Sequence, residues 1–202
     1  MRQTGIFAGR AQVVDPYGRY GWTRGGGKVW HGGLDLVGLD DTTVRMPYYK
    51  GKRITGRVVR ARIVTERRDK TWEWGWYVCV QLDRGQTPDT VNFLYFAHCE
   101  KLLVQAGQTV TSGDALAVMG NTGNAAGGYK HCHLEVRATA GGTGLDPTAY
   151  AGCENAVGIY GAAAKLQTIT IGPVSQGDAD AVKALCDARG MTAAGLYTSK
   201  WV

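Results

Sequence analysis

Short segments with alternating hydrophobic and polar positions dominate the chain up to about residue 150. Side chains two apart on a strand point to the same face, so such alternation predicts strands. Similar β-like runs occupy 92–104 and 130–138, and glycines separate short apolar segments between them, as in hairpins. The clearest run is 71–83, whose alternate apolar positions are Trp72, Trp74, Trp76, Val78 and Val80. The pattern therefore predicts a mainly β fold, with 71–83 as one continuous strand.

The pattern changes beyond residue 150, where we predict a second, smaller unit. Small and polar residues fill 153–165, which we interpret as a linker. An apolar run at 166–173 predicts a strand, and Ser175 and Gly190 are suited to begin and end a helix. A last strand is predicted at 195–202. The expected organisation is a β domain over 1–152, the linker over 153–165 and a small β-α-β unit over 166–202.

Composition excludes few classes of function. The 202 residues are 44% hydrophobic and 20% charged, values typical of globular proteins. The five cysteines include no Cys-x-x-Cys pair, so we expect reduced, mostly buried thiols rather than a disulfide framework. The net charge of +6 favours an anionic partner. We interpret the basic segment 50–70 as a solvated strand face or hairpin, with attraction to anionic wall polymers as the alternative. Nucleic-acid binding is disfavoured because no recognition motif accompanies the charge.

Targeting signals are not evident in the sequence. The first 14 residues lack the apolar core of a secretory signal, and no apolar run approaches the length of a membrane span. We therefore expect synthesis in the cytoplasm without a classical signal peptide, and release by another route if the protein acts elsewhere.

The chemistry is concentrated on the four histidines. His131 and His133 are two residues apart in a predicted strand, so both side chains project from one face. His31 and Asp35 lie in the segment His-Gly-Gly-Leu-Asp, and His98 ends a β-like run. Imidazole and carboxylate are good zinc ligands, and three protein ligands with one open position are typical of catalytic zinc. The two histidines left over are then candidates for a base and for a stabiliser of the developing oxyanion.

These motifs resemble those of the lysostaphin-type zinc metallo-endopeptidases, which cut peptide bonds in bacterial peptidoglycan. The segment 31–35 is similar to the HxGxD motif of that family, and 128–133 is similar to its GxxHxH motif. The run from His98 through the glycine-rich hairpins and the segment 145–150 also resemble the family, so the likeness covers about residues 9–150.

The resemblance implies a central antiparallel β-sheet with an open groove. It implies one Zn²⁺ per chain, held by His31, Asp35 and His133. It further implies that His131 acts on the bound water and that His98 is the second catalytic histidine.

The sequence departs from the family pattern at several positions. The family's tyrosine two residues before the middle histidine is Phe96 here, with Tyr95 preceding it, and Cys132 replaces a larger apolar residue. Neither is a ligand position. We interpret Glu135 as a structural residue that does not face the ligands, and the tryptophans of 71–83 as core rather than as a surface for stacking sugars.

The sequence therefore predicts a zinc endopeptidase that hydrolyses a cross-bridge or stem peptide of peptidoglycan, as a phage or prophage lysin or a virion-associated module. One alternative is a catalytically inactive wall-binding or regulatory module of the same fold. Another is a structural zinc site, for which Cys99 or Cys132 must supply a fourth ligand. The C-terminal unit resembles the start of a SPOR-type peptidoglycan-binding domain and is a candidate wall-binding or accessory element. Neither the scissile bond nor an oligomeric state follows from the sequence.

Overall fold

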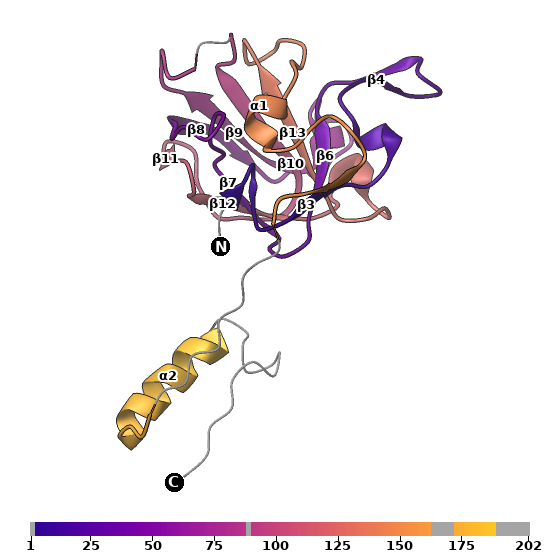
Figure 1. Ribbon diagram of the computed structural model, residues 1–202. Helices are drawn as coiled ribbons and strands as arrows, with labels where there is room; N and C mark the ends of the chain where they lie inside the picture. Colours follow the sequence, from indigo (N-terminus) through magenta and orange to yellow (C-terminus); the bar gives the residue numbers. More distant parts are fainter. Residues whose placement is uncertain (1–2, 88–89, 163–171, 189–202) are drawn as a thin grey trace. The chain divides into compact units, whose positions relative to one another are not determined.

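The computed structural model describes residues 3–87, 90–162 and 172–188 (Figure 1). The chain divides into two compact units, residues 1–165 and residues 166–202. Within the described residues, no helix is long and apolar enough to cross a membrane.

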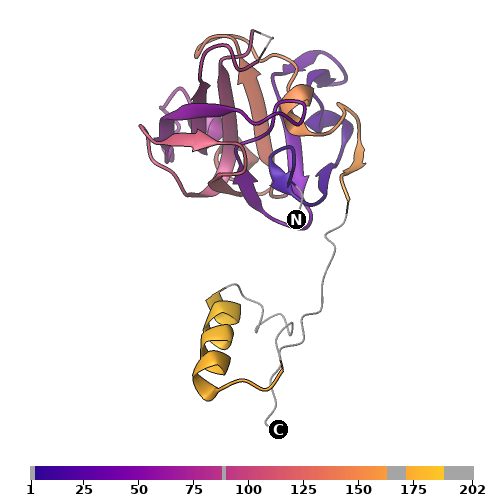
Figure 2. The same cartoon turned by 60° about the vertical axis from the view of Figure 1, so that its left-hand side comes forward.

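A large antiparallel sheet forms the first unit (Figures 1 and 2). Across the sheet, the strands follow the order β11 (Thr109–Thr111), β8 (Thr55–Arg62), β9 (Trp76–Leu82), β10 (Phe93–Leu102), β13 (Cys132–Arg137), β6 (Leu34–Gly38), β3 (Ala11–Val13) and β14 (Gly158–Tyr160). Strand β12 (Ala115–Met119) pairs with β10 and with β7 (Thr43–Arg45). The fold is therefore mainly β with a central antiparallel sheet, as the sequence predicted.

Two small hairpins and four short helical segments complete the described part of this unit. The hairpins are β1 (Gln3–Thr4) with β2 (Phe7–Ala8), and β4 (Gly21–Arg24) with β5 (Val29–His31). The helical segments are the 3₁₀ turns η1 (Pro16–Gly18), η2 (Trp72–Trp74) and η3 (Gly123–Ala125), and the α-helix α1 (Thr148–Ala151). The described part of the second unit contains the helix α2 (Gln176–Ala188).

Strand alternation divides the central sheet into two faces. On β13, Cys132 and Leu134 are fully buried in the main core, where Leu36 of β6 and Phe96 of β10 also lie. The intervening position, His133, faces the other way, because successive side chains on a strand point to opposite faces. A smaller apolar cluster on this second face contains Tyr77, Cys79, Tyr95 and Ala97. One face of the sheet is thus covered by the main core, and the other carries the polar side chains of β13.

A β-bulge interrupts this alternation at His98. Phe96 pairs with Val78 and Cys99 with Trp76, so β10 contains one more residue than β9 across this interval. His98 has a φ of 63°, which is uncommon for a residue other than glycine. Without the extra residue, His98 would share the main-core face with Phe96. The bulge leaves Cys99 in the core and turns His98 to the opposite face.

The prediction of one continuous strand over 71–83 is wrong in its first half. Trp72 and Trp74 belong to η2, and the strand begins only at Trp76. Between them, Gly75 has a φ of 61°, and a Cβ at this position would lie 2.4 Å from the Gly123 amide nitrogen. The glycine therefore ends the 3₁₀ turn and lets it pack against η3. Trp76 packs on the main core, whereas Trp74 packs on the smaller cluster of the second face.

The predictions for the segment beyond residue 152 concern the linker, one helix and two strands. Strand β14 lies inside the segment expected to be a linker, and its pairing with β3 extends the sheet to residue 160. The helix predicted after Ser175 is confirmed, and the Ser175 hydroxyl accepts a 3.2 Å hydrogen bond from the Asp178 amide. The predicted strands at 166–173 and 195–202 lie outside the described residues, apart from Gly172 and Pro173 of the first.

The basic segment and the cysteines agree with their simpler interpretations. In β8, Val58 is buried while Arg57 and Arg60 are exposed, as expected for a solvated strand face. The five cysteines are free thiols, and four of them are buried.

We predict that Gly75→Ala destabilises the first unit more than Gly85→Ala does. Both glycines have a positive φ, which a residue with a Cβ rarely adopts, so alanine is strained at either position. At Gly85 a Cβ would meet nothing within 4 Å, whereas at Gly75 it would collide with the backbone of η3. The collision should add about 1–3 kcal/mol. Urea unfolding curves of the two variants measure the difference; equal losses of stability would contradict the packing of η2 on η3.

Candidate metal centre

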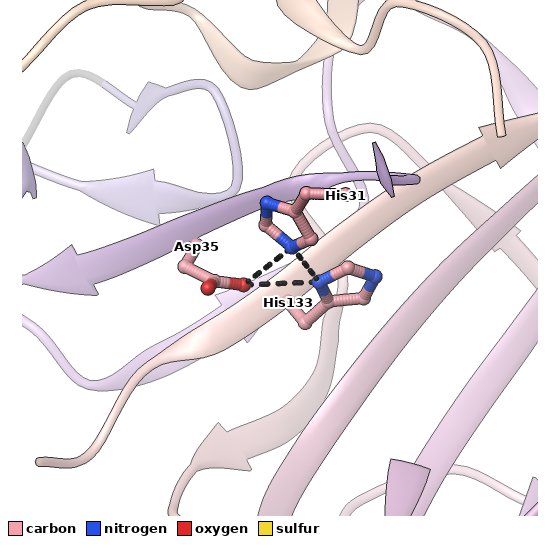
Figure 3. A group of neighbouring side chains, drawn as sticks. All are labelled: His31, Asp35 and His133. Atoms are coloured by element: carbon pink, nitrogen blue, oxygen red, sulfur yellow. Dashed lines mark hydrogen bonds and ion pairs between the residues drawn. The ribbon is translucent and has the colours of Figure 1, made fainter. Parts of the chain in front are cut away.

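The register of β6 and β13 places Asp35 directly opposite His133 (Figure 3). Directly opposite residues on neighbouring antiparallel strands have Cβ atoms about 4.5–5.5 Å apart. Leu34 and Leu36 flank Asp35 and point into the main core, so Asp35 shares the second face with His133. Asp35 Oδ1 lies 2.9 Å from His133 Nδ1. Two of the predicted ligands are thus brought together by strand pairing alone.

The third predicted ligand, His31, ends β5 and reaches the same point because two glycines follow it. A Cβ on Gly33 would lie 2.4 Å from the carbonyl oxygen of Leu134 and 2.7 Å from His133 Cε1. Only glycine therefore lets the segment after His31 pass so close to β13. His31 Nε2 comes within 3.0 Å of His133 Nδ1 and within 3.3 Å of Asp35 Oδ1 (Figure 3).

Three potential metal-binding atoms thus converge on one point. His31 Nδ1 donates a 2.8 Å hydrogen bond to the Arg19 carbonyl oxygen, which leaves the lone pair of a neutral ring on Nε2. His133 Nε2 donates to Glu135 Oε2 at 3.2 Å, which leaves Nδ1 as the inward-facing atom. Donor atoms at zinc-ligand distances of 2.0–2.1 Å stand roughly 3.3 Å apart in a tetrahedron. The residues present therefore fit a zinc ion, with the sequence-predicted ligands as its donors.

The electrostatics of the cluster favour a cation. Burial disfavours the charged form of His133, but hydrogen bonds to Asp35 and Glu135 outweigh it and raise the pKa of His133 to about 9. For Asp35, burial acts to raise the pKa, yet hydrogen bonds from His133 and His31 hold it well below the usual value. Two carboxylates thus face one buried imidazole. Without a metal the site binds a proton, and a metal ion would displace that proton.

Glu135 contacts a predicted ligand, which the sequence interpretation missed. Its spacing of two from His133 places it on the same face, so the expectation that it does not face the ligands is wrong. It holds the outer nitrogen of His133, and the Arg137 Nε donates to Glu135 Oε1 at 2.7 Å. The Arg137 guanidinium in turn lies 4.8 Å from the Trp74 ring centre and 4.9 Å from that of Tyr95. This chain of contacts fixes the orientation of His133.

His131 and His98 lie beside the three ligands. His131 Nε2 is 3.7 Å from Asp35 Oδ1, and its Nδ1 donates to the Tyr129 carbonyl oxygen at 3.1 Å. His98 Nδ1 donates to the Thr122 carbonyl oxygen at 2.9 Å, and its ring centre lies 4.9 Å from that of His131. Burial lowers the pKa of His131, and burial together with neighbouring imidazoles lowers that of His98 to about 3. Both rings are therefore neutral near pH 7, with the lone pair on Nε2.

The five predicted residues border a pocket of about 400 Å³. Its walls come from η1, the β4–β5 hairpin, η2, η3 and the segment before β13. The other lining residues are Asp15, Tyr17, Gly18, Arg24, Gly32, Glu73, Trp74, Asn124, Ala125, Tyr129 and Glu135. Among the tryptophans of the predicted stripe, Trp74 borders this pocket. Arg24 was not singled out from the sequence, although its Nη2 lies 2.7 Å from Asp35 Oδ2.

The cysteines do not complete a closed metal site. Cys99 and Cys132 are fully buried in the main core, on the face of the sheet opposite to the histidines. Within the described part of the chain, His31, Asp35 and His133 form the group of potential metal ligands. A structural zinc with a cysteine as fourth ligand is therefore disfavoured.

Comparisons with solved structures find related folds at low sequence identity. The catalytic domain of lysostaphin from Staphylococcus simulans is 22% identical, with 65% of this chain and 86% of that chain covered and a TM-score of 0.48. A catalytic-domain mutant of the prophage-encoded M23 protein EnpA from Enterococcus faecalis is 20% identical, with coverages of 64% and 85% and a TM-score of 0.46. LytU is 21% identical, with coverages of 73% and 84% and a TM-score of 0.47.

A comparison with curated proteins gives no match. Residues 31–147, from the first predicted ligand to just beyond the last strand of the site, match peptidase family M23. This match spans more than half of the 202 residues. The chain therefore belongs to peptidase family M23.

Proposed function

We propose that this protein is a zinc-dependent endopeptidase that hydrolyses peptide bonds of bacterial peptidoglycan, in the cross-bridge or the stem peptide. The observation that carries the proposal is the convergence of His31 Nε2, Asp35 Oδ1 and His133 Nδ1 beside an open pocket. Three ligands leave one coordination position for water or substrate, as in catalytic rather than structural zinc sites.

One zinc ion per chain is proposed, held by His31, Asp35 and His133. When bound, it would polarise a carbonyl oxygen and lower the pKa of a coordinated water to about 7. Glu135 supports the site by accepting the hydrogen bond of His133 Nε2, which fixes the tautomer and the direction of the ligand nitrogen.

The two remaining histidines are assigned catalytic roles. His131 is assigned the proton of the attacking water, because its Nε2 lies beside the ligand Asp35 while its Nδ1–H is held by the Tyr129 carbonyl. The proton can then pass to the nitrogen of the leaving amine. His98 is assigned as the second catalytic histidine, since its backbone is bent to bring the ring against His131.

Peptidoglycan is proposed as the partner on the basis of the family and of charge. The net charge of +6 suits a wall that carries carboxylates and other anionic groups. We further propose a phage or prophage lysin as the setting, acting on the wall after release, and the unit 166–202 as a wall-binding or accessory element. Nucleic acid is not proposed as a partner.

A catalytically inactive, wall-binding module of the same fold is the alternative. It requires no intact site, whereas this chain retains the three ligands and both further histidines in one cluster. The retained residues favour the enzyme.

We predict different outcomes for two histidine variants. His133→Ala should lose both zinc and activity, because it removes a ligand. His131→Ala should keep zinc but lose about 10²–10⁴-fold in hydrolysis rate, the usual contribution of a general base. Zinc content and release of peptides from purified peptidoglycan measure the two effects. If His131→Ala cleaves at the normal rate, the role assigned to His131 is wrong.

Removal of the metal should abolish hydrolysis reversibly. We expect a chelator to stop the digestion of purified peptidoglycan and stoichiometric zinc to restore it, since the ion would activate the attacking water. Mass analysis of fragments from several peptidoglycan chemotypes then identifies the scissile bond. Undiminished digestion by the metal-free protein would exclude the zinc mechanism.

Glu135→Gln should weaken zinc binding by about 10–100-fold, because the neutral amide is a poorer partner for the outer nitrogen of His133. The control is Glu100→Gln, which removes a carboxylate that pairs with Lys130 outside the pocket. Competition with a fluorescent chelator measures both affinities. An unchanged affinity for the Glu135 variant would show that this contact does not support the ligand.

A further inference from the structure

Arg24 is directed toward the predicted ligands by a second β-bulge. In the β4–β5 hairpin, Gly21 pairs with His31 and Trp22 with Trp30, but Arg24 pairs with Val29. Strand β4 therefore contains one extra residue, Thr23, between the last two pairs. Trp22 remains on the outer side and is 64% exposed. The extra residue turns Arg24 to the side of His31, and bulges near active sites commonly redirect a side chain in this way.

The guanidinium of Arg24 contacts two of the three ligand residues. Its Nη2 donates to Asp35 Oδ2 at 2.7 Å and lies 3.0 Å from His31 Nε2. Its Nε donates to the Tyr17 carbonyl oxygen at 3.3 Å, which ties the side chain to η1. Oδ2 is the carboxylate oxygen that faces away from the two imidazoles. Arg24 is thus held beside the predicted metal site by Asp35 Oδ2, whereas the potential metal-binding atom of this carboxylate is Oδ1.

An ion on His31 Nε2 would take the single lone pair of that nitrogen. Arg24 would then lose this contact but keep Asp35 Oδ2 and the Tyr17 carbonyl as acceptors. The freed N–H becomes available to an oxygen of the substrate. A guanidinium presents five such donors and keeps its charge at all relevant pH values.

Among the residues that line the described pocket, no other side chain combines hydrogen-bond donors with a permanent positive charge. His98 and His131 each donate their Nδ1–H to a backbone carbonyl, so their neutral rings turn a lone pair rather than a proton toward the pocket. Of the residues that line the described pocket, Arg24 is the single arginine or lysine. The charged side chains nearby, Asp15, Glu73 and Glu135, are acidic.

Hydrolysis of a peptide bond needs positive charge at one defined oxygen. The oxygen of water adds to the carbonyl carbon as a base removes its proton, and the π electrons of the C=O bond move to the carbonyl oxygen. The C–N bond then breaks, and the nitrogen leaves with a proton. Donors directed at the oxyanion stabilise this step more than any other single contribution in acyl transfer.

We propose that Arg24 is a further catalytic residue, which donates a hydrogen bond to the carbonyl oxygen of the scissile peptide bond and stabilises its negative charge. This inference rests on the proposed peptidase function. It assigns to Arg24 the stabilisation of the oxyanion. His98 and His131 do not fit this role, because their Nδ1–H groups are bonded to backbone carbonyls and Nε2 carries a lone pair.

The test compares Arg24→Gln and Arg24→Lys with Lys28→Gln. Lys28 is an exposed residue on the same hairpin, so its variant removes one positive charge without touching the pocket. The measurements on each zinc-loaded protein are kcat and KM for purified peptidoglycan. Zinc affinity is measured separately by chelator competition, and a urea unfolding curve confirms that each variant is folded.

We expect Arg24→Gln to lower kcat by about 10²–10³-fold with little change in KM. Arg24→Lys should be intermediate, since it keeps the charge but loses the planar fork. Lys28→Gln should match the unmodified protein. Zinc affinity of Arg24→Gln should be equal or tighter, because a neighbouring positive charge has been removed.

Two results would overturn the proposal. One is a kcat for Arg24→Gln within threefold of the unmodified protein. The other is a loss of activity that follows weakened zinc binding, which would make Arg24 a positioning residue for Asp35. If the unmodified protein and Lys28→Gln do not hydrolyse peptidoglycan at all, the proposed function itself fails, and the assignment of Arg24 fails with it.

Discussion

The antiparallel pairing of β6 with β13 is the constraint on which the site depends. It sets Asp35 against His133 on one face of the sheet, while Leu34 and Leu134 fill the core on the other face. A slip of one residue would turn either side chain into the apolar core, where an unpaired charge is costly. The same contacts that stabilise the fold therefore specify the register that brings two metal-binding atoms together.

Two β-bulges place side chains on faces that regular strand alternation would not give them. An extra residue in β10, with a positive φ at His98, moves this histidine from the core face to the face of the ligands. An extra residue in β4 moves Arg24 from the outer side of its hairpin to the inner side. Strained or bulged backbone is retained when its side chain has a function. Both irregularities bring side chains to the same pocket, which supports its interpretation as an active site.

Charge balance explains why so many ionisable groups coexist in this buried region. Asp35 and Glu135 flank His133, and each carboxylate also contacts an arginine, Arg24 or Arg137 respectively. Each negative charge thus has a hydrogen-bonded positive neighbour, as burial requires. The two arginines have different positions: Arg24 borders the pocket, while Arg137 is not among its lining residues and contacts Glu135, which holds the outer nitrogen of His133.

The sequence by itself determined the β class, the ligand candidates and the family resemblance, because these depend on local alternation and on short motifs. His131 and His133 are two residues apart on one strand, so their common face follows from spacing. The meeting of Asp35 and His31 with His133 required the pairing of β6 with β13 and the close approach at Gly33. The break of the tryptophan run at Gly75, the place of β14 and the roles of Glu135 and Arg24 were decided only by the tertiary structure. These features depend on a bulge in β4, on the close approach of η2 to η3 and on contacts between distant segments. A local sequence pattern does not specify which distant residue a side chain will contact.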